Sequence, residues 1–146
     1  MDLSYSTEAE AYRETVSSFL EANWPLKGKE KELSFDEQCT LFRDRATEAG
    51  FLYRSIPKQY GGSEQETDAL SAQVIREEFG KKWAPMEARG IGTMMLAPTL
   101  LERGEQWMKD RWVQKTLFGE IKWCQGYSEP GSGSDLASLK TRGELV

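Results

Sequence analysis

Through its first 120 residues, the chain repeats apolar side chains at intervals of three and four, with charged residues between them. This spacing puts the apolar side chains on one face of an α-helix, so it predicts amphipathic helices that pack against one another. After Gly119 the repeat stops, and a β-tolerant stretch leads into a segment rich in Gly, Ser and Pro. The sequence therefore predicts a mainly α protein, with a helical bundle over residues 1–120 and the beginning of a β domain over residues 121–146.

Local signals place several helix ends. Pro25 disfavours helical backbone at the residue before it, so the first helix should end near there. Ser34 and Glu37 have the spacing of a capping box, and Gly50 suits a left-handed cap at the end of the second helix. Ser63 is followed three residues later by an acid, which predicts another helix start. The expected helices cover about residues 7–22, 35–49, 63–80, 98–104 and 105–117.

Residues 121–127 predict a β-strand, because they are β-tolerant and bounded by loop residues. A single strand has no partner and is not stable by itself. The sequence thus resembles a complete helical domain joined to a truncated β domain.

Composition excludes several function classes. The net charge of −5 argues against nucleic acid as a general partner. With no histidine, imidazole zinc sites and His-based nucleophilic machinery are excluded, and the widely separated Cys39 and Cys124 predict no metal site. Cys39 is expected to pack as a small hydrophobic residue. The chain shows no secretory signal and no stretch apolar enough for a membrane span, so a cytoplasmic location is expected.

The segment from Ser128 to Asp135 is the candidate ligand-binding loop. Pro130 favours an extended Glu129, and the glycines at 131 and 133 permit positive φ, which would let backbone amides form a concave donor array. Three serines add hydroxyl groups. Such a surface suits a polar ring system or a phosphate-bearing ligand. From composition alone, a solvated Gly/Ser linker is the simpler interpretation.

Resemblance to a known family favours the ligand-binding interpretation. The run Ser-Glu-Pro-Gly-Ser-Gly-Ser-Asp at 128–135, followed by Leu-Ala-Ser, closely resembles the flavin-loop signature of the acyl-CoA dehydrogenase family. The similarity continues upstream along most of the chain. It includes residues 56–57, 60–62, 77–80, 97–104 and 112–119.

This resemblance implies a flavoprotein oxidoreductase with a helical N-terminal domain, a middle β domain and a helical C-terminal domain, and with FAD completed by a neighbouring subunit. The implied reaction is α,β-desaturation of an acyl-CoA thioester, in which a glutamate takes the α-proton and FAD accepts the β-hydride. The family's base lies in the C-terminal domain, so no catalytic residue is assigned here and the chain alone is expected to be inactive. Glu129 corresponds to a structural acid beside the flavin loop.

Residue by residue, Ser128 matches the position whose amide and hydroxyl meet the pyrimidine side of the flavin. Ser134 matches a serine that touches both the flavin site and the pantetheine of CoA. Gln125 and Tyr127 match flavin-contacting positions of the strand. They depart from the common pattern, since Tyr127 replaces a small aliphatic residue and Gln125 stands where some members have an aromatic one.

The segment from Arg89 to Met95 resembles the family's acyl-pocket lining, although Met94 and Met95 fit a plain core at least as well. Implied partners are an acyl-CoA substrate, electron-transfer flavoprotein, and further subunits in a homo- or hetero-oligomer, a dimer or tetramer. Two alternatives remain: a non-catalytic helical interaction domain with a vestigial β segment, and an acyl-CoA binder that needs no FAD.

Overall fold

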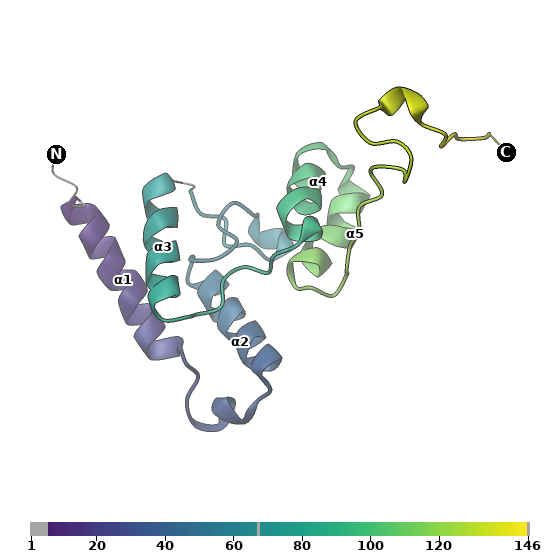
Figure 1. The fold of residues 1–146 in the computed structure, drawn as a ribbon. Coiled ribbons are helices and arrows are strands. Elements are labelled where there is room, and N and C mark those ends of the chain that lie inside the picture. Colours follow the sequence, from purple (N-terminus) through teal and green to yellow (C-terminus); the bar gives the residue numbers. More distant parts are fainter. Residues whose placement is uncertain (1–5, 67, 146) are drawn as a thin grey trace.

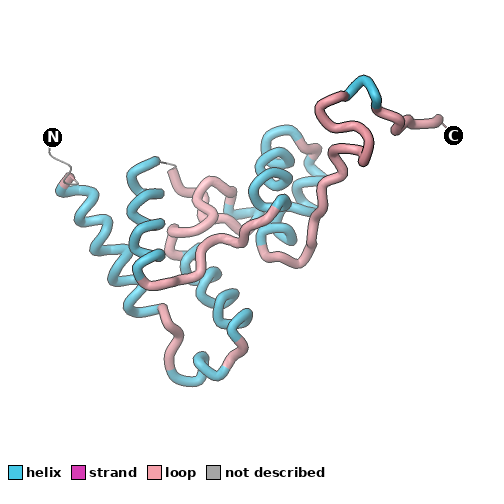
Figure 2. Tube along the Cα trace, viewed as in Figure 1, coloured by secondary structure: helices cyan, strands magenta, loops and turns pink. Residues whose placement is uncertain are grey.

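The computed structural model describes residues 6–66 and 68–145. Helices dominate the described residues, and no β-strand occurs among them (Figures 1 and 2). The prediction of a mainly α fold is confirmed. The α-helices are α1 (Thr7–Asn23), α2 (Phe35–Glu48), α3 (Ala69–Lys81), α4 (Ala97–Arg103) and α5 (Gln106–Leu117).

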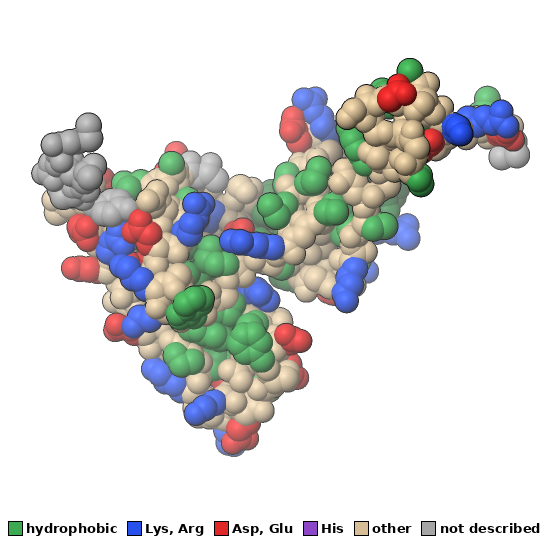
Figure 3. Space-filling view, viewed as in Figure 1, with side chains coloured by type: hydrophobic (Ala, Val, Ile, Leu, Met, Phe, Trp, Pro, Cys, Tyr) green, Lys and Arg blue, Asp and Glu red, His purple; other side chains and the backbone are tan. Residues whose placement is uncertain are grey.

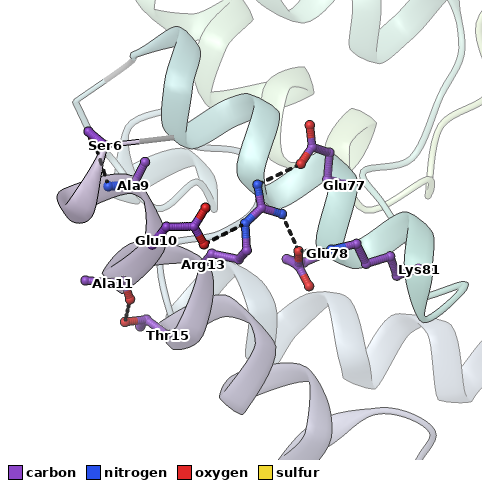
Figure 4. Close-up of polar contacts among 9 residues, drawn as sticks. All are labelled: Ser6, Ala9, Glu10, Ala11, Arg13, Thr15, Glu77, Glu78 and Lys81. Carbon is purple, nitrogen blue, oxygen red and sulfur yellow. Dashed lines mark hydrogen bonds and ion pairs between the residues drawn. The ribbon is translucent and has the colours of Figure 1, made fainter. Parts of the chain in front are cut away.

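Helices α1 and α3 lie side by side, whereas α4 and α5 form a second pair (Figure 1). Within the first pair, Arg13 of α1 reaches two acids of α3 (Figure 4). Its guanidinium lies 2.9 Å from the Glu77 carboxylate and 2.5 Å from that of Glu78, and Lys81 lies 2.6 Å from the same Glu78 oxygen. Burial by itself raises the pKa of Glu78, but hydrogen bonds from Lys81 and Arg13 outweigh it and lower the pKa. The network therefore holds a buried carboxylate in its charged form.

One hydrophobic core runs through both helix pairs, from Val16 to Leu117. Phe42 of α2 is fully buried, and its ring centroid lies 5.1 Å from that of Trp24 and 5.8 Å from that of Phe79. Aromatic pairs at these separations add to the stability gained from burial. Helix α2 is thereby joined through side chains to α3 and to Trp24, the residue that follows α1.

The local end signals of the first two helices are confirmed. Helix α1 ends at Asn23, and Trp24 is extended as a residue before proline should be. Ser34 and Glu37 form the capping box of α2, and Gly50 follows that helix with a φ of 86°. The spacing of Phe35, Cys39, Phe42, Ala46 and Ala49 predicts one buried face for α2, but that face is shorter, because Phe35 is 70% exposed.

The predicted start of α3 near Ser63 is wrong. The helix begins at Ala69, where the Asp68 side chain accepts a hydrogen bond from the Ser71 amide. Ser63 is instead buried, and its hydroxyl donates to the Leu52 carbonyl at 2.9 Å. Glu64 has a φ of 50°, which is incompatible with a right-handed helix. Ser63 does not cap the helix because its hydroxyl is hydrogen-bonded to Leu52 instead.

The predicted strand over 121–127 is also absent. These residues leave α5 without continuing it and run in irregular backbone toward the yellow end of the chain in Figure 1. No other segment among the described residues offers a sheet edge with which they could pair. No helix within residues 6–66 and 68–145 is long and apolar enough to cross a bilayer.

Candidate functional site

A π-helical turn, Gly92–Leu96, lies directly before α4. The Ala97 amide bonds to the Gly92 carbonyl, which adds one residue to the helical turn. Such turns occur frequently at functional sites. Met94 is 70% exposed and Met95 is 52% exposed, so the interpretation of both as plain core is wrong.

Trp123 attaches the segment after α5 to this turn. Its indole nitrogen donates to the Thr116 hydroxyl at 2.9 Å, and its ring meets that of Trp112 edge-on with centroids 6.0 Å apart. Gly92 makes the contact possible, because a Cβ there would lie 2.5 Å from the Trp123 ring. Residues flanking Trp123 are therefore held beside the π turn.

An open apolar groove of about 350 Å³ results where the two segments meet. Gln125 lines this groove together with Ile91 and Met95, so one predicted flavin residue lies beside the segment predicted to line the acyl pocket. Figure 3 shows hydrophobic side chains gathered on the surface in the region of α4 and α5. The full lining is Ile91, Met95, Leu96, Thr99, Trp123, Cys124, Gln125 and Gly126.

The Gly/Ser loop is closed by its own hydrogen bonds. Glu129 and Ser132 exchange two backbone bonds of 3.1 Å, and the buried Ser132 hydroxyl donates to the Asp135 carbonyl at 2.7 Å. The Glu129 carboxylate accepts hydrogen bonds from the amides of Lys140 and Thr141 and from the Thr141 hydroxyl. The Thr141 hydroxyl, followed by the Lys140 amide, lowers the pKa of Glu129. Glu129 thus joins the start of the loop to the chain that follows it.

The remaining predicted site residues project from this loop and its approach. Tyr127 is 84% exposed, and Ser128 and Ser134 are exposed as well. Neither serine hydroxyl bonds to another residue within the described part of the chain. The structure places Gln125 in the groove but does not bring Ser128 or Ser134 to its lining.

The expected concave donor array does not form with positive φ at the loop glycines. Gly131 and Gly133 are not among the glycines with positive φ, which in the described residues are Gly28, Gly50, Gly61, Gly90 and Gly119. A Cβ at Gly126, Gly131 or Gly133 would meet no atom within 4 Å. These glycines instead leave bare, open backbone on the loop surface.

The comparison with protein families identifies the helical part. The model of the acyl-CoA dehydrogenase N-terminal domain matches residues 6–120. The chain belongs to the acyl-CoA dehydrogenase family.

Several acyl-CoA dehydrogenases are similar to it. Acyl-CoA dehydrogenase IpdE1 of Mycolicibacterium smegmatis is 34% identical over 121 residues, which are 83% of this chain and 30% of the relative. Acyl-CoA dehydrogenase FadE34 of Mycobacterium tuberculosis is 56% identical over 95 residues, or 65% of this chain and 13% of that protein. The crystal structure of the ChsE4–ChsE5 complex from Mycobacterium tuberculosis matches with a TM-score of 0.56 and 26% identity, covering 97% of this chain and 35% of the matched one. The chain therefore spans about a third or less of the length of each of these three proteins.

The sequence alone did not identify the residues whose role depends on tertiary contacts. Gly92 and Thr116 matter because Trp123 packs on both. No spacing rule connects these three positions. The Glu129 contacts with residues 140–141 are equally non-local.

Proposed function

We propose that the chain is the N-terminal part of an FAD-dependent acyl-CoA dehydrogenase that introduces an α,β double bond into an acyl-CoA thioester. The observation that carries this proposal is the loop at 128–135, which has the flavin-loop sequence and presents the uncommitted hydroxyls of Ser128 and Ser134. The family match over residues 6–120 supports it.

The residues of the loop fit a flavin. A flat ring can approach the open backbone at Gly126, Gly131 and Gly133, where no side chain or neighbouring atom intervenes. Ser128 would donate to the pyrimidine side of the ring, with Gln125 and Tyr127 beside it, and Ser134 would contact both the flavin and the pantetheine of CoA. When bound, FAD supplies a two-electron acceptor for the hydride that leaves the substrate.

In this proposal, the side chains of this chain position the flavin and the substrate and polarise the flavin ring, and they do not take the α-proton. Glu129 directly follows Ser128 in the sequence, and its carboxylate is already bonded to Lys140 and Thr141. A carboxylate held in its charged form by such bonds is a weak base, so the base that takes the α-proton belongs to another part of the enzyme. The apolar groove beside Gln125 would receive part of the acyl chain.

We also propose that the working enzyme is an oligomer, a dimer or a tetramer, of like or unlike subunits. A similar solved structure is a complex of two different chains, ChsE4 and ChsE5. Electron-transfer flavoprotein would reoxidise the enzyme, and a cytoplasmic location is expected.

The test uses the complete gene product that carries these 146 residues. The purified protein should be yellow, and acyl-CoA should bleach it. Replacing one preorganised donor in a dry site can cost about 10²–10³ in rate, so Ser128→Ala should slow flavin reduction or loosen FAD. Ser134→Ala should mainly weaken acyl-CoA binding. Stopped-flow reduction and flavin titration measure both effects.

Wild-type FAD affinity, reduction rate and substrate affinity in both serine variants would overturn the assignment of this loop. A colourless protein that binds acyl-CoA would favour the FAD-independent binder. A colourless protein that binds no acyl-CoA would favour a helical interaction domain.

A further inference from the structure

A second cavity, which shares no lining residue with the apolar groove, lies between α3, the loop around Tyr53 and the π turn. It measures about 360 Å³, which is within the range of small-molecule sites in proteins. Part of its wall is apolar and comes from Met86, Met94 and Pro98. Arg89, Thr93 and Met94 on its wall belong to the segment that resembles the family's acyl-pocket lining, but the proposed function places the acyl chain in the apolar groove and not in this cavity.

Two arginines on its wall have no ion-pair partner among the described residues. Arg76 comes from α3 and Arg89 from the connection that leads to the π turn. Neither guanidinium forms an ion pair or hydrogen bond with any other residue in the described ranges. Arg45 and Arg54, by contrast, are both paired with carboxylates. Two unpaired cations on one cavity favour the binding of an anion there.

Two further polar side chains on the wall, those of Glu87 and Tyr53, already form hydrogen bonds within the chain. Glu87 also lines the cavity, and its carboxylate accepts the Tyr53 amide at 2.5 Å. The Tyr53 hydroxyl donates to the Leu117 carbonyl and accepts from the Ala88 amide. Positive charge exceeds negative charge on the cavity wall by two residues to one, and both guanidinium groups are free to donate to an anion.

We propose that this cavity binds a small organic oxyanion, a carboxylate or phosphate monoester on a short apolar chain. The planar guanidinium fork matches the geometry of both head groups. The head group would lie on Arg76 and Arg89, and the apolar chain would lie against Met86, Met94 and Pro98. The anion comes either from a separate small acid or from the phosphates of coenzyme A.

The experiment follows ¹H–¹⁵N NMR spectra of the chain during titration with hexanoate, hexyl phosphate and the neutral control hexanol. Saturable changes in amide chemical shift should concentrate at residues 53–56 and 86–98. Hexanol should bind about tenfold more weakly than hexanoate or hexyl phosphate. Arg76→Gln and Arg89→Gln should each reduce the affinity for the anions about fivefold to tenfold. Arg103→Gln is the matched control, because Arg103 lies outside the cavity and pairs with Glu102.

Coenzyme A is then added as a competitor. Displacement of hexyl phosphate assigns the head group to the phosphates of coenzyme A, and persistence of the bound probe assigns it to a separate acid. Equal binding of hexanol, shifts spread over the whole surface, or unchanged affinity in both arginine variants would overturn the proposal. None of these measurements needs FAD or turnover, so they are independent of the proposed function.

Discussion

At the scale of the residue, Gly92 determines how the segment after α5 is held. A Cβ at this position would lie 2.5 Å from the Trp123 ring and 2.8 Å from a Thr116 methyl group. We expect Gly92→Ala to destabilise the chain by about 1–3 kcal/mol, as overpacking does, and to expose Trp123. Urea unfolding followed by tryptophan fluorescence measures both. Gly80→Ala is the control. Gly80 lies within α3, and a Cβ at this position would have no atom within 4 Å, so the substitution should leave stability unchanged or increase it.

Glu129 controls the closure of the Gly/Ser loop. Hydrogen bonds from Thr141 and Lys140 lower the pKa of Glu129, so the closure should persist at neutral pH and be lost as pH falls through that lowered pKa. We expect the amide resonances of Lys140 and Thr141 to titrate with a midpoint below the ordinary glutamate value. In Glu129→Gln this transition should vanish, whereas Glu144→Gln should retain it. A midpoint at or above the ordinary value would contradict the closure.

At the scale of the element, the charged network between α1 and α3 makes stability depend on pH. Because the pKa of Glu78 is lowered in the fold, its contribution is present at neutral pH and is lost as acid is added. Glu78→Gln should cost about 1–3 kcal/mol at pH 7 and flatten the loss of stability below about pH 5. Denaturant unfolding across pH measures this. Glu10→Gln removes a more exposed partner of Arg13, 3.5 Å away, and should cost at most about 0.5 kcal/mol.

The same elements show what sequence can and cannot predict. The ends of α1 and α2 were predictable because Pro25 and the Ser34–Glu37 pair act on their own neighbours. The start of α3 was not, because the Ser63 hydroxyl bonds to Leu52, eleven residues away. A strand at 121–127 depends on a partner that no local pattern reveals.

Periodicity also could not place the methionines of the π turn. A π turn adds a residue and shifts the side chains that follow relative to a regular helix. Met94 and Met95 thereby leave the core and lie at the surface near the groove and the second cavity. In the candidate site, the tertiary contacts of Trp123, which no local pattern reveals, place Gln125 beside the π turn.

At the scale of the whole molecule, the helical core is continuous while the proposed flavin surface is open. The core extends from Val16 to Leu117, but Ser128 and Ser134 face solvent, and no described residue covers them. Donors in contact with water stabilise developing charge far less than donors in a dry site. Correct positioning of both reactants can contribute about 7–11 kcal/mol to a reaction, and an open loop cannot provide it.

We therefore expect the 146-residue chain, supplied with FAD, to show no acyl-CoA oxidation with an artificial electron acceptor. The complete gene product, assayed in parallel, should reduce the same acceptor, which shows that the substrate and dye are competent. The isolated chain should nevertheless remain folded, because its buried aromatic cluster around Phe42 lies entirely within it. Near-UV circular dichroism checks that point. Turnover above a buffer blank that survives repurification of the isolated chain would place the reacting groups within these residues and would contradict the assignment of the base to another part of the enzyme.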